Sequence, residues 1–94
     1  MGKQLIVELT GPVRVQAGLK EVSIAVEDNA TWGDVIAALA RALPALVGTA
    51  IAEDRRSIAW PYLLNVGGRR TVRDFGEKAQ IQEGDHLSLL EETC

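Results

Sequence analysis

The most reactive side chain in this sequence belongs to its single cysteine, Cys94, which ends the tail formed by residues 91–94. A thiol could carry sulfur as a persulfide or a mixed disulfide, or the carboxylate of Cys94 could be activated for transfer. Two neighbouring glutamates and a terminal carboxylate disfavour the thiolate, which is the reactive form. The alternative is an unreactive residue in a frayed end. Thr93 and Cys94 are thus the candidate residues of a sulfur-carrying or conjugating tail.

No other group of residues has the spacing of an active site. His86 has no cysteine or second histidine at metal-ligand spacing, so a solvated surface histidine is the favoured interpretation. Glu53 and Asp54 are adjacent, but nothing places them in a cleft as a general acid and base. Phosphate-binding, nucleophile-elbow and zinc-protease motifs are absent from the sequence. We therefore expect no catalysis by this chain alone, no metal site and no cofactor.

Composition indicates one small acidic domain that comprises residues 1–94, with residues 91–94 as a short tail. The 94 residues carry a net charge of −3, which argues against nucleic-acid binding although Arg69, Arg70 and Arg73 cluster. The sequence contains no apolar run of membrane-spanning length and no signal peptide, and one cysteine cannot form an internal disulfide. A cytoplasmic protein that binds neither nucleic acid nor membrane is expected.

Two alternating stretches predict a hairpin at the start of the chain. Residues 3–10 and 21–27 each place an apolar side chain at every second position, which is typical of half-buried strands. Gly11 and Pro12 are expected to end the first strand, and a turn is expected across residues 15–20.

A helix is predicted from Thr31, because a threonine followed three positions later by Asp34 fits a helix N-cap. Apolar residues then recur at helical spacing: Val35, Ile36, Leu39, Ala42, Leu43 and Leu46. Pro44 cannot continue an interior turn, so the helix should end near Leu43. Residues 49–59 are interpreted as a surface loop.

Three short strands should follow. Residues 62–66 and 69–72 are expected to form a second hairpin around Gly67 and Gly68. A turn at residues 82–85 leads to a final strand at 86–90, which should lie parallel to the first strand. The resulting order, β-β-α-β-β-β, is the outline of an α+β β-grasp fold: a mixed sheet with one main helix packed across it.

Four segments resemble the MoaD/ThiS family of ubiquitin-like sulfur-carrier proteins. They are LTGPVR at residues 9–14, NATWGDVI at 29–36, LNVGGR at 64–69 and QIQEGDHL at 80–87. They occur in the family's order and spacing, so the resemblance extends from Leu5 to Leu90. It implies the β-grasp fold independently of the apolar patterns.

The resemblance also implies a mechanism. In this family a partner enzyme adenylates a C-terminal glycine, which becomes a thiocarboxylate and delivers sulfur in molybdopterin biosynthesis or another pathway. This sequence lacks the terminal Gly-Gly, because its only glycine pair, Gly67-Gly68, is internal. We expect a carrier that docks onto an adenylating or cofactor-synthesis enzyme, with Cys94 in place of Gly-Gly. The alternatives are a non-conjugating binding subunit of an enzyme complex and a ubiquitin-like protein modifier.

The expected partner interface is the sheet face that points away from the helix. If the apolar residues of the first strand point inward, alternation places Ile6, Leu63 and Leu90 on that outer face. Trp60 could pack or serve as an exposed anchor, since aromatic residues are enriched in interface hot spots. Trp32 is expected to cover the start of the helix. Nothing in the sequence indicates an oligomeric state.

Overall fold

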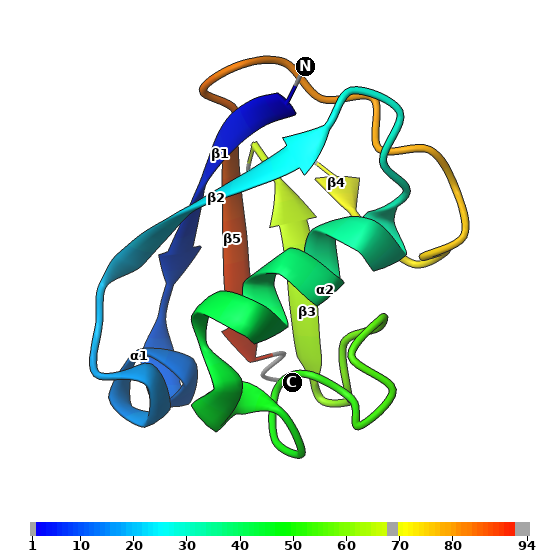
Figure 1. Ribbon diagram of the computed structural model, residues 1–94. Coiled ribbons are helices and arrows are strands. Elements are labelled where there is room, and N and C mark those ends of the chain that lie inside the picture. Colours follow the sequence, from blue (N-terminus) through cyan, green and yellow to red (C-terminus); the bar gives the residue numbers. More distant parts are fainter. Residues whose placement is uncertain (1, 68–69, 92–94) are drawn as a thin grey trace.

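Five strands form one mixed sheet in the order β2-β1-β5-β3-β4, and helix α2 lies across one of its faces (Figure 1). The computed structural model describes residues 2–67 and 70–91. The elements are β1 (Gly2–Leu9), α1 (Gly11–Ala17), β2 (Glu21–Glu27), α2 (Trp32–Ala42), the 3-10 helix η1 (Pro44–Leu46), β3 (Tyr62–Val66), β4 (Arg70–Thr71) and β5 (His86–Glu91). β1 pairs antiparallel with β2 and parallel with β5, so the predicted β-grasp arrangement is confirmed.

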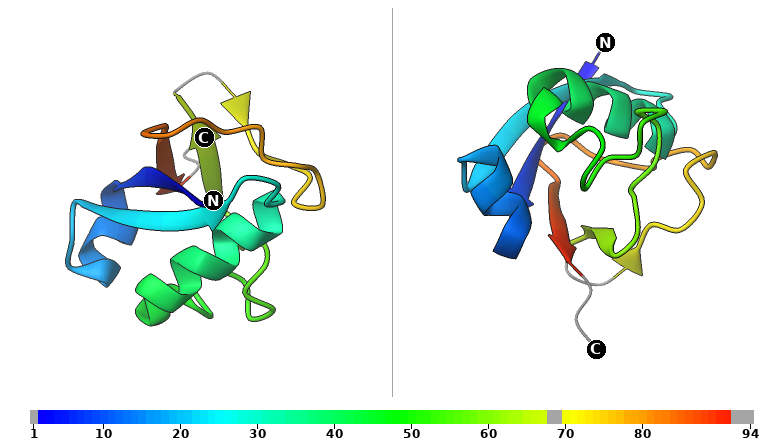
Figure 2. Two further views of the ribbon diagram at one scale, coloured as in Figure 1. Left: turned by 45° about the horizontal axis from the view of Figure 1, so that its top comes forward. Right: turned by 90° about the horizontal axis from the view of Figure 1, so that it is seen from below.

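The core lies between the inner face of the sheet and α2. Alternation along β1 and β5 buries Leu5, Val7, Leu87 and Leu89 completely, as the period of two requires. Five of the six apolar residues predicted for the helix are buried: Val35, Ile36 and Leu39 in α2, Leu43 directly after it, and Leu46 in η1. Ala42 is exposed, and Trp32 is only 1% exposed, so it covers the start of α2 from within the core. Figure 2 shows α2 gathered on one side of the strands.

The predicted turn between β1 and β2 is wrong in its first half, because residues 11–17 form helix α1. Pro12 suits the first turn of a helix, since its fixed φ is already helical and its missing N–H costs no hydrogen bond. Gly18 ends the helix with φ of 73°, and its N–H bonds to the carbonyl of Arg14. Only Val13 is buried, so contact with the core stabilises this short helix more than its own sequence does.

The segment at residues 49–59 was predicted as a surface loop and is partly core. Ala50 and Ile51 are completely buried, and Ile51 forms isolated bridges with Val47 and Ile58. The charged residues that follow Ile51 are exposed, as predicted. The apolar pair therefore anchors a loop whose charged tip is solvated.

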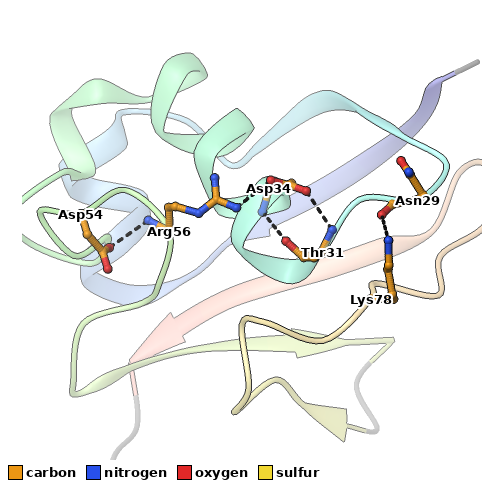
Figure 3. A network of polar contacts seen from close by, with 6 residues as sticks. All are labelled: Asn29, Thr31, Asp34, Asp54, Arg56 and Lys78. Carbon is orange, nitrogen blue, oxygen red and sulfur yellow. Dashed lines mark hydrogen bonds and ion pairs between the residues drawn. The ribbon is translucent and has the colours of Figure 1, made fainter.

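A polar network fixes this loop and the β4–β5 connection against the start of α2 (Figure 3). The Thr31 N–H donates to Asp34 at 3.0 Å and the Asp34 N–H donates to the Thr31 hydroxyl at 3.2 Å, so the predicted N-cap is a full capping box. The Arg56 guanidinium donates to the other Asp34 oxygen at 2.7 Å. These hydrogen bonds, that from the Thr31 backbone first, hold the pKa of Asp34 below its usual value. Lys78 donates to the Asn29 carbonyl at 3.0 Å.

Candidate docking surface

The sheet has an outer face that helix α2 does not cover. Residues on this face alternate with the buried core positions of the same strands, which fixes their direction. They are Gln4, Ile6 and Glu8 of β1, Ser23 and Ala25 of β2, Leu63 and Asn65 of β3, and His86, Ser88 and Leu90 of β5. The three apolar residues predicted for the partner interface, Ile6, Leu63 and Leu90, all belong to this set and are half-buried.

Leu63 and Leu90 form a cross-strand pair. They lie directly opposite one another in the antiparallel ladder of β3 and β5, where side chains on one face are in contact distance. Tyr62 lies opposite Glu91 at the end of the same ladder. The two leucines therefore make one continuous apolar area near the end of β5.

Trp60 lies beside Leu63, one member of this pair. Its side chain is 73% exposed, and with Leu63 and Phe75 it lines a shallow hollow of about 200 Å³. An exposed tryptophan beside half-buried leucines is the composition found at the centre of many protein interfaces. We call Trp60, Leu63 and Leu90 the docking patch.

Ile6 lies apart from the docking patch. Its neighbours across the sheet are Ser23 on β2 and His86 on β5. The next row of the outer face is polar and contains Glu8 and Ser88, and it separates Ile6 from the leucine pair. The three strand residues predicted for the interface thus share the outer face but divide into a leucine pair and a single isoleucine. Trp60 adjoins Leu63 from the segment that precedes β3.

The sequence prediction missed a second exposed apolar residue near the end of the sheet. Val15 on α1 is 81% exposed, although the sequence indicated only a turn there. The same helix contacts β3, because the Gln16 amide nitrogen lies 3.2 Å from the Tyr62 hydroxyl. A helix prediction at residues 11–17 would have been needed to find this residue.

The candidate tail lies outside the described residues, since Thr93 and Cys94 follow the last one, Glu91. Glu91 ends β5 opposite Tyr62, the first residue of β3 and a near neighbour of Trp60 in the chain. The described part of the chain therefore ends at the same end of the sheet as the docking patch.

The other titratable groups do not assemble into a reaction centre. Within residues 2–67 and 70–91, no three histidine, cysteine or acidic side chains are arranged to hold a metal ion. His86 is exposed and its Nδ1 lies 3.7 Å from Glu8 Oε1. None of the helices in the described part has both the length and the apolar character needed to cross a bilayer.

No protein-family model matches this sequence, and no curated protein matches it by sequence. The structure is similar to that of small archaeal modifier protein 1 from Haloferax volcanii, with a TM-score of 0.78 and 26% identity over 96% of both chains. The corresponding protein from Methanosarcina acetivorans gives a TM-score of 0.73 at 20% identity, covering 97% of this chain and 94% of its own.

A third neighbour is a putative molybdopterin converting factor, subunit 1, from Pyrococcus furiosus. It gives a TM-score of 0.71 at 19% identity and covers 97% of this chain and 99% of its own. At that identity, as for the Methanosarcina protein, the likeness shows the fold alone. Together the neighbours confirm the resemblance to ubiquitin-like β-grasp proteins of the sulfur-carrier family.

Proposed function

We propose that this protein is a small ubiquitin-like carrier or modifier that docks onto an adenylating enzyme or a cofactor-synthesis enzyme and has no catalytic activity of its own. The observation that carries the proposal is the similarity to a small archaeal modifier protein, which covers 96% of both chains at 26% identity. A match that spans both chains supports a shared mode of action more strongly than a local one.

The docking patch supports this proposal. Leu63 and Leu90 are half-buried, and Trp60 is largely exposed, so each has apolar surface left to bury in a complex. Burial of such surface stabilises a complex by roughly 25 cal/mol per Å² before the costs of association. Tryptophan is among the residues that contribute most to interface affinity.

The position of the patch also supports the proposal. β5 ends at the same end of the sheet at which β3 begins with Tyr62, two residues after Trp60 in the chain. An enzyme that covers the patch would have the segment after Glu91 within reach. We assign Thr93 and Cys94 to the tail on which a group is carried or through which the protein is conjugated.

Intact-mass measurement tests the proposal. The protein is incubated with ATP, sulfide and the adenylating enzyme of the same organism, alongside a variant that lacks Cys94. A mass gain that corresponds to the exchange of one carboxylate oxygen for sulfur, with AMP as the leaving group, is expected for the full chain only. No mass change, with complex formation kept by the shortened variant, would leave the non-conjugating binding subunit in its place. No complex at all would contradict docking itself.

A further inference from the structure

Two glutamates face one another on the half of the outer face formed by β1 and β2. Glu8 of β1 lies directly opposite Glu21 of β2 in the antiparallel register. Leu9 N–H donates to the Lys20 carbonyl at 2.8 Å, so Leu9 and Lys20 are a hydrogen-bonded pair. Glu8 and Glu21 are therefore the adjacent non-hydrogen-bonded pair, in which side chains lie closer together. Like charges in this position destabilise the sheet.

The described part of the chain offers little to neutralise these two carboxylates. Glu8 approaches only His86, at 3.7 Å, and a histidine is charged only when it is protonated. Among residues 2–67 and 70–91, no lysine or arginine forms an ion pair with Glu8 or Glu21. Both glutamates are exposed. The free protein thus has an acidic pair that a positive group from outside would stabilise.

An apolar hollow lies next to this pair. It has a volume of about 290 Å³, and Ile6 is the apolar side chain of the outer face that lines it. Val22 also borders it, but Val22 lies opposite the buried Val7 and packs against the core. Glu21 lines one side and Glu83 another, where Glu83 Oε1 accepts the Gln4 N–H at 3.0 Å. The hollow therefore combines a site for an apolar side chain with carboxylates on two sides.

We propose that this hollow, the Ile6 hollow, binds an apolar side chain of a partner protein that is flanked by lysine or arginine, with one cation placed between Glu8 and Glu21. The inference rests on the proposed function, because it extends the docking face beyond the docking patch. A cation from the partner removes the repulsion only in the complex, so the pair favours the bound state over the free one.

The negative charge around the hollow favours a basic partner protein over a second copy of this chain, a nucleic acid or an anionic lipid surface. A second copy of this chain would bring another net charge of −3 toward Glu8 and Glu21. Nucleic acids and anionic lipid surfaces are repelled for the same reason. A basic protein surface with an exposed apolar side chain is the class that matches both the hollow and its rim.

Peptide titration followed by amide chemical shifts tests the inference. The probes are acetyl-Lys-Leu-Arg-Val-Lys-amide and a matched control in which glutamate and glutamine replace the basic residues. The basic peptide is expected to change the amide chemical shifts of four residues near the hollow, and the control peptide is expected to leave them unchanged. These residues are Gln4, Ile6, Ser23 and Gly84. A double variant in which glutamine replaces both glutamates, Glu8→Gln with Glu21→Gln, should bind the basic peptide with an affinity roughly threefold to tenfold lower. Equal shifts with both peptides, or unchanged affinity in the double variant, would overturn the inference.

Binding to the adenylating enzyme separates this inference from the proposed function. The double glutamine variant and Leu90→Asp are each compared with the unmodified protein for affinity to that enzyme. Loss of affinity in both variants supports both the proposed function and the Ile6 hollow. Loss with Leu90→Asp alone overturns the Ile6 hollow and leaves the proposed function standing. If neither variant loses affinity, the enzyme binds elsewhere on the protein, so the Ile6 hollow and the docking patch are both overturned while docking itself stands.

Discussion

Leu63 and Leu90 lie directly opposite each other across the β3–β5 ladder, and both project from the face of the sheet that α2 leaves uncovered. Trp60 shares a hollow with Leu63, so these three residues form one apolar area at the end of the sheet where β5 ends. This juxtaposition joins residues that are up to thirty positions apart in the chain. The proposed docking function therefore rests on this apolar area and not on a cluster of polar side chains.

Trp60→Ala should weaken binding to the adenylating enzyme by more than about 1 kcal/mol, as expected for a hot-spot tryptophan. The free energy of unfolding should change little, because the side chain is 73% exposed. Isothermal calorimetry measures the first quantity and urea denaturation the second. Trp60→Phe serves as the matched control and should recover much of the affinity. Unchanged affinity in Trp60→Ala would remove Trp60 from the docking patch.

Ile51→Ala should destabilise the protein by about 2–5 kcal/mol, because it empties a fully buried site. A residue in a solvated loop would change stability by less than about 0.5 kcal/mol. Val15→Ala provides the control, since Val15 is 81% exposed. Urea denaturation of the three proteins distinguishes the two cases, and similar midpoints for all three would show that the loop is not anchored in the core.

Thr31→Ala should cost about 1 kcal/mol, because it removes the hydroxyl that caps α2. For a chain of this size, that loss corresponds to a fall in Tm of roughly 4–8 °C. Thr31→Ser keeps the hydroxyl and should remain close to the unmodified protein. Calorimetric melting of both variants checks the result; equal Tm values would mean that the capping box contributes nothing to stability.

The lowered pKa of Asp34 predicts an acid-dependent loss of stability. A carboxyl whose pKa is depressed in the folded state stabilises the fold above its unfolded pKa, for which 3.8 is the reference value. This contribution is lost as the pH falls below that value and through the folded pKa. Asp34→Asn should therefore be less stable than the unmodified protein near neutral pH, and the difference should shrink below about pH 4.

Urea midpoints measured across this pH range check the prediction. Arg56→Gln removes only one of the groups that lower the pKa of Asp34, so its curve should lie between the other two. A difference between Asp34→Asn and the unmodified protein that stays constant with pH would contradict the account.

Much of the fold followed from local patterns. Period-two alternation identified β1 and β2 almost to the residue, and Thr31 with Asp34 located the start of α2. These signals are reliable because each depends on the side chains of one element and the solvent. Helix α1 gave no such signal, since it has only seven residues and Val13 is its one fully buried side chain, with Ala17 partly buried against the core.

Ile51 and Ile6 show that sequence patterns also fail where a residue's surroundings depend on tertiary contacts. Ile51 precedes a run of charged residues, and only the tertiary structure shows that it packs inward while they face solvent. Alternation placed Ile6 on the outer face, but its distance from Leu90 depends on the register between β1 and β5, which a single strand does not encode. For the same reason the opposition of Glu8 and Glu21 could be recognised only after the strands were paired.

The most direct test of the account is ATP–pyrophosphate exchange by the adenylating enzyme of the same organism, measured with this protein as the activated partner. The unmodified protein and Ala45→Asp, an exposed position in η1, should both stimulate exchange. Leu63→Asp and Leu90→Asp should abolish it while circular dichroism shows the fold intact, because each puts a charge into the docking patch. Exchange that persists in both leucine variants, or that the unmodified protein fails to stimulate, would contradict the account.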